Sequence, residues 1–389
     1  MTNEEFIAIH QEADVRRLAL AKANEGIDLH FCLQQIAGRQ AALKKLPTWA
    51  EADIIYPPRL SMEQCSSEPT ARYKQRLAER LLPAERQSMI DLTGGFGIDF
   101  AFLSVLFDKA VYVESNPLLC DIARHNFPIL GLRNATIHNL PCEKTLDGMG
   151  NFSLIYLDPS RRDALGRKVV ALCDCQPDVE ALQGLLLSHA PFVVVKLSPM
   201  IDIQDTLRRI PCTSEVHTVS VDGECKEVLL VLHAPTEAVT YHCVNIAAQT
   251  QVFITRDVDA EPRIADRLGQ YLYEPNASIL KAGVQDALCK AFPVEKLQRF
   301  SHLFISHHFI ENFPGRAFTV QDVYGFSKQD VRRLQAELDQ CNLTVRNFPS
   351  SVAELRKRLK LREGGDIYLF ATTLADGQHV LLRCKPAHK

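Results

Sequence analysis

The chain has 389 residues and a formal net charge of −3, with 46% hydrophobic and 23% charged residues, a composition typical of a globular protein of two or three domains. No stretch approaches about 18 unbroken apolar residues, and the acidic, amphipathic start over 1–5 is unlike a signal peptide, so we expect a cytoplasmic protein without a membrane partner. The 12 cysteines are scattered through apolar segments without a C-x-x-C pair, so neither a disulfide scaffold nor a metal site is expected.

Residues 1–85 are predicted to form a helical region. Apolar residues recur at helical spacing over 4–23 and again over 30–45, and Gly26 separates the two runs. This pattern predicts two helices ahead of the first strand.

A further helix is predicted over 70–82. Ser67 is a candidate N-cap for it, and Pro69 suits its first turn. Thr70 or Lys74 could close over a ligand bound nearby. A helix that only packs on a sheet is the simpler interpretation, because polar residues are common on the exposed face of such helices.

The next segment combines glycines with two acidic residues. A short apolar strand over 88–92 contains Asp91 and runs into a glycine-rich turn over 93–97, after which a helix follows. Glycine suits this position because a residue without Cβ lets backbone N–H groups and the helix N-terminus approach a ligand. A second strand over 110–113 delivers Glu114 about 20 residues later, where a carboxylate can accept both ribose hydroxyls. The pattern predicts an adenosine-type ligand, although a glycine pair after a strand can also be a plain turn.

The glycine spacing separates two classes of cofactor. A dinucleotide fingerprint has the form G-x-G-x-x-G/A, but Phe100 stands at its third small position, so a nicotinamide cofactor is not expected. The segment resembles motif I of the class I S-adenosylmethionine-dependent methyltransferases, D-x-G-x-G-x-G, with Asp91, Gly95 and Gly97 in place and Thr93 at the first glycine. This resemblance implies S-adenosylmethionine as the cofactor. The residues that it implies for the cofactor site are Asp91, Thr93, Gly94, Gly95, Gly97, Asp99, Glu114, Ser115 and Asn139.

Strands and helices alternate from 86 to about 234, which implies an α/β fold with a mostly parallel sheet. Seven strands are predicted, over 88–92, 110–113, 135–138, 152–157, 192–197, 215–221 and 228–233. Asp222-Gly223 is a strong hairpin signal between the last two. A Rossmann-like sheet of seven strands that ends in an antiparallel hairpin resembles the class I methyltransferase domain, which we assign to 86–235. Six residues between the second and third strands resemble a run found in many RNA methyltransferases: Asn116, Ala123, Arg124, Asn126, Gly131 and Leu132.

The fourth strand ends in Asp158-Pro159-Ser160-Arg161, at the same edge of the sheet as the glycine-rich turn. This segment resembles motif IV, D-P-P-x, and the resemblance makes these four residues the catalytic candidates. Asp158 would orient or deprotonate the acceptor. Ser160 and Arg161 stand where base-amine methyltransferases have an aromatic residue, which argues against amine methylation, and no cysteine ends the next strand as in uracil-carbon methyltransferases. Arg161 and Arg162 could grip a phosphate or pair with nearby acids.

Beyond 235 the alternation stops. Residues 236–300 are predicted to be linker strands and a helix, and 301–389 a small α+β domain. Its two helices are predicted to begin with the capping pairs Ser327–Asp330 and Ser351–Glu354. The last part, about 320–389, is similar in topology and charge to the THUMP module, a ferredoxin-like RNA-binding unit of tRNA- and rRNA-modifying enzymes, which implies an RNA partner.

Charge is distributed unevenly along the chain. Residues 1–279 carry 27 basic and 36 acidic side chains (net −9), whereas 280–389 carry 17 basic and 11 acidic ones (net +6). The densest basic run lies at the end of the helix that is predicted to begin with the Ser351–Glu354 pair. It comprises Arg356, Lys357, Arg358, Lys360 and Arg362. Such a stripe suits a nucleic-acid backbone, but it can also be the solvated face of an amphipathic helix.

These patterns together predict an S-adenosylmethionine-dependent methyltransferase that acts on RNA, either tRNA or rRNA. Two alternatives stay open: a catalytically inactive protein that binds S-adenosylmethionine and RNA, and a methyltransferase for a small molecule.

Overall fold

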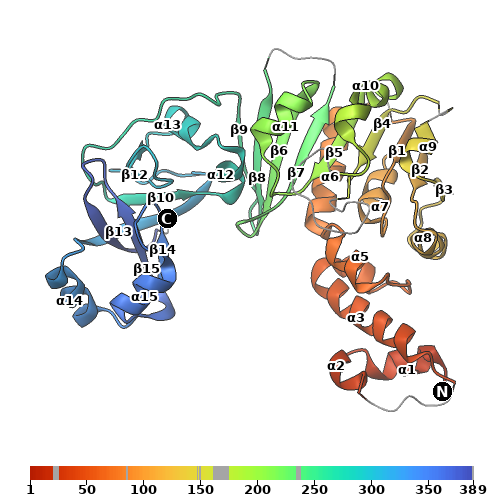
Figure 1. Cartoon of the computed structure of the whole chain (residues 1–389), viewed down its shortest axis with the longest axis horizontal. Helices are drawn as coiled ribbons and strands as arrows, with labels where there is room; N and C mark the ends of the chain where they lie inside the picture. Colours follow the sequence, from red (N-terminus) through yellow and green to blue (C-terminus); the bar gives the residue numbers. More distant parts are fainter. Residues whose placement is uncertain are drawn as a thin grey trace. The chain divides into compact units, whose positions relative to one another are not determined.

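The computed structural model describes residues 1–20, 26–84, 86–146, 148, 150–160, 175–233 and 238–387 (Figure 1). The chain forms two compact units. The first comprises Met1–Glu215 and Val228–Glu237, and the second comprises Val216–Glu227 and Ala238–Lys389. The division falls within one β-hairpin of the first sheet.

The N-terminal region is helical, as predicted. Its helices are α1 (Asn3–His10), α2 (Val15–Leu18), α3 (Leu29–Lys45), α4 (Pro47–Ala50), α5 (Arg59–Gln64) and α6 (Glu68–Leu81). Figure 1 shows α3, α5 and α6 following one another toward the first sheet. The single helix expected over 4–23 is wrong: α1 ends at His10, and the Asp14 carboxylate caps a separate short helix by accepting from the backbone N–H of Arg16 at 2.9 Å. Ser67 is the N-cap residue of α6, as predicted, but its side chain makes no capping hydrogen bond.

The first sheet has nine strands in the order β3-β2-β1-β4-β5-β7-β6-β8-β9. The strands are β1 (Ser88–Asp91), β2 (Lys109–Val113), β3 (Ala135–His138), β4 (Leu154–Leu157), β5 (Phe192–Leu197), β6 (Thr213–Val221), β7 (Glu224–Leu232), β8 (Thr240–Ile246) and β9 (Gln251–Thr255). The first five are parallel, and β7 runs antiparallel to β5. The predicted Rossmann-like sheet is therefore confirmed, and β8 and β9 extend it beyond the seven predicted strands.

The central strands have continuous apolar sequences, which suit strands that are buried on both faces of the sheet. All four residues of β4 are buried, as are Met89 and Ile90 of β1, and such continuous apolar runs are typical of parallel strands. The helices of this region are α7 (Ile98–Ser104), α8 (Pro117–Ile129), α9 (Cys142–Leu146), α10 (Val179–His189) and α11 (Ile203–Arg209). The turn of the β6–β7 hairpin has positive φ at both central residues, 49° at Asp222 and 79° at Gly223, which matches the predicted Asp-Gly turn.

The second sheet has seven strands in the order β11-β12-β10-β13-β16-β15-β14. The strands are β10 (Tyr271–Pro275), β11 (Glu295–Lys296), β12 (Phe304–Ser306), β13 (Gly315–Tyr324), β14 (Gln340–Val345), β15 (Arg362–Thr373) and β16 (His379–Pro386). The helices are α12 (Ala277–Ala282), η2 (Gln285–Ala287), α13 (Leu288–Ala291), α14 (Lys328–Glu337) and α15 (Val352–Leu359). Both predicted capping boxes, at Ser327 and Ser351, are present. One apolar core includes Leu334 of α14, Leu355 of α15 and Leu369 of β15.

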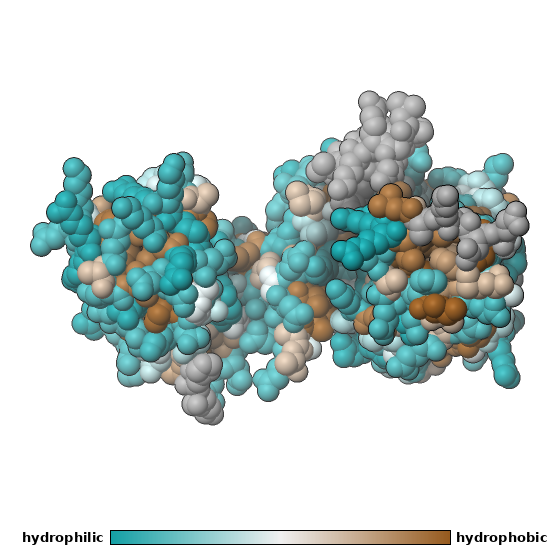
Figure 2. Space-filling model, turned by 90° about the horizontal axis from the view of Figure 1, so that it is seen from below, coloured by the Kyte–Doolittle hydropathy of each residue, from teal (hydrophilic) through white to brown (hydrophobic). Residues whose placement is uncertain are grey.

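On the face of the molecule in Figure 2, hydrophilic residues cover most of the surface and hydrophobic residues form scattered patches, as is ordinary for a folded chain. Among the residues that the structure describes, no helix has the length and apolar character needed to cross a membrane.

Candidate active site

The turn between β1 and α7 requires glycine. A Cβ on Gly94 would lie 2.1 Å from the Tyr112 ring, so any larger residue would displace β2. Gly97 has φ = 87°, and a Cβ there would lie 2.8 Å from the Phe127 ring. Gly95 differs, because its φ is 56° but a Cβ would meet only the Thr93 carbonyl oxygen, at 3.8 Å. The backbone at Gly95 therefore borders open space, where a ligand can approach it.

Glu114 leaves the end of β2 and faces this turn. Its carboxylate accepts hydrogen bonds from the backbone N–H of Gly95 at 2.9 Å and of Asn116 at 2.7 Å. The Ser115 hydroxyl donates to the same carboxylate at 3.3 Å. The Asn139 amide donates to the backbone oxygens of Glu114 and Ser115 at 2.9 and 3.1 Å. The structure thus brings these predicted residues together, and Asn139 holds the loop that carries Glu114.

Thr93 links the turn to the end of β4. Its backbone N–H donates to the Asp91 carboxylate at 2.9 Å, and its hydroxyl accepts from the backbone N–H of Asp158 at 2.6 Å. A glycine at this position, as in the motif that the segment resembles, has no hydroxyl to make the second bond. Thr93 therefore fixes the distance between the two segments predicted to carry cofactor and catalytic residues.

Asp99, in the first turn of α7, lies in a cluster of buried polar side chains. Its carboxylate accepts from the Ser66 hydroxyl and the Tyr156 hydroxyl, both at 2.7 Å, and lies 3.2 Å from the Lys74 ammonium and 3.9 Å from that of Lys196. Burial alone would raise the pKa of Asp99. The two ammonium groups and the hydrogen bonds from Tyr156 and Ser66 together more than offset this effect, so its pKa lies below the ordinary value. Asp99, which was predicted to bind the cofactor, is thus held by side chains of the protein itself.

Lys196 of β5 is a functional candidate that the sequence interpretation missed. It is buried, and its ammonium forms an ion pair with the Asp158 carboxylate. The available signal was a single lysine in the otherwise apolar strand Phe192–Leu197, because a lysine is almost never buried without a charged partner.

Two of the other catalytic candidates, Pro159 and Ser160, lie at the same strand end. Pro159 follows Asp158, and the exposed Ser160 pairs with Gln176 through two backbone hydrogen bonds of 2.7 and 3.1 Å. Arg161 and Arg162 lie outside the described residues. The side chain of Asp158 is 37% exposed, whereas that of Lys196 is 11% exposed, so the ion pair is open to a substrate on the carboxylate side.

Comparisons with known proteins identify the chain. A crystal structure of a “putative methyltransferase” from Porphyromonas gingivalis W83 is 32% identical, covers 99% of this chain and 98% of its own, and has a TM-score of 0.88. This chain belongs to the class I S-adenosylmethionine-dependent methyltransferases. Two proteins of Mycobacterium tuberculosis, from strains CDC 1551 and H37Rv and described as uncharacterized S-adenosylmethionine-dependent methyltransferases, are each 24% identical over 336 residues, 84% of this chain and 88% of theirs. Residues 315–386 match a family described as THUMP domain-like, and 271–314 match a ferredoxin-like domain.

The predicted enzyme class, cofactor and C-terminal THUMP-like domain are therefore confirmed. The methyltransferase uses S-adenosylmethionine, and the THUMP-like match falls within the region assigned to an α+β domain.

Asp91 carries the most perturbed carboxyl group at the turn of the methyltransferase. It is only 1% exposed, and burial raises its pKa well above the ordinary value. The Thr93 N–H partly offsets this effect, while the neighbouring carboxylates of Asp99, Asp158 and Glu114 raise the pKa further. Burial therefore makes the charged form of Asp91 unfavourable relative to the neutral form, and a cation bound beside it would favour the carboxylate.

We expect Asp91→Asn to stabilise the cofactor-free methyltransferase by an amount that grows with pH. A raised folded-state pKa means that this carboxyl group contributes its full stability below its unfolded pKa of about 3.9 and loses it as the pH rises toward the folded value. Asparagine imitates the neutral form at every pH. Thermal unfolding of both proteins from pH 5 to pH 8 measures the difference, and a difference independent of pH would contradict the assignment.

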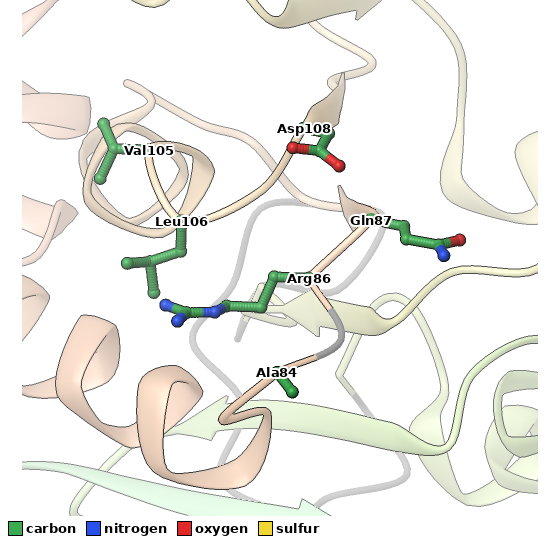
Figure 3. Close-up of a pocket in the computed structure, with 6 residues that line it drawn as sticks. All are labelled: Ala84, Arg86, Gln87, Val105, Leu106 and Asp108. Carbon is green, nitrogen blue, oxygen red and sulfur yellow. The ribbon is translucent and has the colours of Figure 1, made fainter.

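A hollow of about 420 Å³ lies at the opposite edge of the sheet (Figure 3). It is lined by Ala84, Arg86, Gln87, Val105, Leu106 and Asp108, which lie around the amino ends of β1 and β2. In Figure 3 the Arg86 side chain runs toward Leu106, while the Gln87 side chain points in the opposite direction. Open α/β sheets bind ligands at the carboxyl ends of their strands, so this hollow is not the candidate active site.

The basic run predicted to bind RNA surrounds the end of α15. Lys357, Arg358, Lys360 and Arg362 are exposed and Arg356 is partly exposed. The Arg358 guanidinium lies 4.0 Å from the centre of the Phe326 ring. No ion pair to a described acidic residue involves any of the five, whereas Arg316, Arg346 and Arg383 of the same unit are each paired.

Proposed function

We propose that this methyltransferase acts on RNA and that its THUMP-like domain holds the phosphate backbone. The observation that carries the proposal is the run Arg356–Arg362, with four exposed cations and no acidic partner among the described residues. Solvated lysines and arginines of this kind neutralise phosphates and release counterions. Leu355 and Leu359 pack into the core, which fixes the helix and leaves Lys357 and Arg358 exposed.

The cofactor is proposed to bind at the carboxyl ends of β1 and β2, where Asp91, Gly95, Gly97 and Glu114 lie. Two features support this fit: the backbone at Gly95 borders open space, and the Glu114 carboxylate accepts a hydrogen bond from the Gly95 N–H. Glu114 would accept hydrogen bonds from the ribose hydroxyls, and Asp91 would lie near the positively charged methionine part. When bound, S-adenosylmethionine supplies an electrophilic methyl group on a sulfonium.

Asp158 is proposed to bind the acceptor. Its backbone is fixed by Thr93 and its carboxylate by Lys196, so the group is positioned before the substrate arrives. Catalysis of methyl transfer depends mainly on such positioning and on electrostatics. Ser160 lies beside it and is exposed, as a group that contacts the acceptor must be.

Changing Lys357, Arg358 and Lys360 to alanine should weaken RNA binding and reduce its salt dependence. If all three contact phosphates of a single strand, the slope of log affinity against log salt should become less negative by about 2, since each contact contributes about −0.7. The loss should be uniform across RNA sequences, because phosphate contacts position without specifying. Filter binding of tRNA and rRNA fragments over a salt series measures the slope.

The matched control changes Arg17, Lys109 and Arg208, three exposed residues of the first unit, to alanine, which removes the same charge. Its slope should equal that of the wild type. Methyl label from S-adenosylmethionine, followed into RNA in parallel, separates the alternatives: RNA affinity without transfer would indicate an inactive binding protein. Transfer to a small molecule that the triple variant retains in full would contradict action on RNA.

A further inference from the structure

Lys196 places a buried positive charge beside Asp158, the residue proposed to bind the acceptor. The lysine is the last residue but one of β5, in which Val193, Val194 and Val195 are buried. Its ammonium contacts the Asp158 carboxylate and lies 3.5 Å from the Ser66 hydroxyl. A cation in so apolar a strand costs free energy that its partners must offset. The place where it emerges is the carboxyl end of β5, beside the strand end that carries Asp158.

A second ammonium, that of Lys74, pairs with the more deeply buried carboxylate of Asp99. Lys74 lies 3.2 Å from Asp99 and 3.3 Å from the Ser66 hydroxyl, so both lysines flank one hydroxyl group. Lys196 lies closer to Asp158 than to Asp99, from which it is separated by 3.9 Å. Lys74 is thus placed to balance the charge of buried Asp99, and Lys196 to act with the more exposed Asp158.

We propose that the Asp158–Lys196 pair contacts the acceptor atom and that this atom is a hydroxyl oxygen. Methylation of a neutral amine builds positive charge on the acceptor nitrogen, which an adjacent ammonium would oppose. A hydroxyl has the opposite need, because it must lose a proton and its oxygen develops negative charge. An ammonium stabilises that charge, and a carboxylate beside it takes the proton.

The proposed step balances. As the acceptor oxygen forms its bond to the methyl carbon, the sulfur–carbon bond breaks, and the sulfur keeps the electron pair in the departing S-adenosylhomocysteine. The hydroxyl proton passes to the Asp158 carboxylate and from its exposed side to water. Lys196 stays protonated and holds the oxygen throughout.

The identity of the hydroxyl rests on the proposed action on RNA. Each RNA nucleotide offers a ribose 2′-hydroxyl, which is both a donor and an acceptor and distinguishes RNA from DNA. The pair therefore predicts ribose methylation. Recognition of the hydroxyl by Asp158 and Lys196 requires no stacking on the base. This agrees with the sequence, which has Arg161 at the last position of the D-P-P-x motif, where base-amine methyltransferases have an aromatic residue.

The test follows the linkage of the transferred methyl group. Total extract from cells lacking the gene is incubated with the enzyme and methyl-labelled S-adenosylmethionine and then separated into RNA, protein and small molecules. We expect label in RNA as an ether on ribose, which survives alkali as a methylated dinucleotide. Lys196→Met should lower the rate about 100-fold, as loss of one preorganised donor does, and Lys196→Arg should recover part of it. Lys109→Met, on the exposed start of β2, should have no effect.

A second readout needs no turnover. Calorimetric affinity for S-adenosylhomocysteine should be the same in wild type, Lys196→Met and Lys196→Arg, because the proposal places Lys196 at the acceptor. Loss of that affinity, or a full transfer rate in Lys196→Met, would overturn the role of Lys196. Label on an RNA base would overturn the hydroxyl acceptor but uphold action on RNA. A methyl ether found only on a small molecule would uphold the hydroxyl acceptor but overturn action on RNA. No label in any fraction would overturn both the hydroxyl acceptor and action on RNA.

Discussion

Changing Asp158 to alanine should lower the rate of methyl transfer by about 10²–10⁴-fold, the contribution typical of a positioned acid–base group. Affinity for S-adenosylmethionine should stay close to that of the wild type, because the turn and Glu114 are untouched. The hydrogen bond from the Asp158 backbone to Thr93 is also kept. Single-turnover transfer of label with saturating cofactor measures the rate, and calorimetry measures the affinity.

Two further variants serve as controls for this result. Asp158→Asn keeps a polar partner for Lys196 and should show a comparable loss of rate, so that a folding defect in the alanine variant can be recognised. Asp108→Ala removes an exposed carboxylate at the opposite edge of the sheet and should be fully active. If Asp158→Asn kept the wild-type rate, Asp158 would not be the proton acceptor.

Changing Lys74 to methionine should reduce the free energy of unfolding by about 3–5 kcal/mol, because removing one partner of a buried ion pair leaves the other charge uncompensated. Lys74 is 1% exposed and Asp99 is 8% exposed, so water cannot replace the lost ammonium. Lys196, at 3.9 Å, compensates only in part. Urea denaturation of the wild type and the variant gives the difference.

The double variant Lys74→Met with Asp99→Asn should be more stable than Lys74→Met alone, since the stranded carboxylate is then gone. Lys109→Met, an exposed lysine in the same unit, should change the stability by less than about 0.5 kcal/mol. If Lys74→Met were as stable as the wild type, Asp99 would not depend on the ammonium in the way that the contacts indicate.

Features set by local chemistry were predictable from the sequence. The glycine-rich turn, the capping boxes at Ser327 and Ser351 and the Asp222-Gly223 hairpin all depend on residues close in the chain, and each is present. The alternation of apolar strands and helices likewise predicted the seven strands from β1 to β7 along the chain. The glycine requirement itself has a cause outside the turn, because the Tyr112 ring fills the space above Gly94.

The centre of the candidate active site was not predictable, because its contacts join distant parts of the chain. Lys196 meets Asp158 across 38 residues, and Ser66 meets Asp99 across 33. Thr93 looked like a departure from a glycine motif, yet its hydroxyl holds the backbone of Asp158. No periodicity or turn signal reports such pairs, since they form only when the sheet brings strand ends together.

Two parts of the fold differ from the prediction for physical reasons. The apolar spacing over 4–23 continues through a helix end, but the Asp14 carboxylate competes for backbone N–H groups and starts a new helix. In the region 236–300, β8 and β9 join the first sheet, whereas β10 pairs with β12 and β13 in the second. Strand partners are a property of the folded chain, and a strand pattern alone does not name them.

S-adenosylmethionine is proposed to be held by the turn after β1 and by Glu114. Calorimetric titration of the wild type and Glu114→Ala with S-adenosylmethionine and with NAD tests it most directly, with Glu79→Ala as an exposed carboxylate control and thermal unfolding as a check on the fold. We expect the wild type and Glu79→Ala to bind S-adenosylmethionine and not NAD, and Glu114→Ala to bind about 10–100-fold more weakly, since a hydrogen bond to a charged group contributes about 1.5–3 kcal/mol. Heat with NAD alone, or an unchanged affinity in Glu114→Ala, would contradict it.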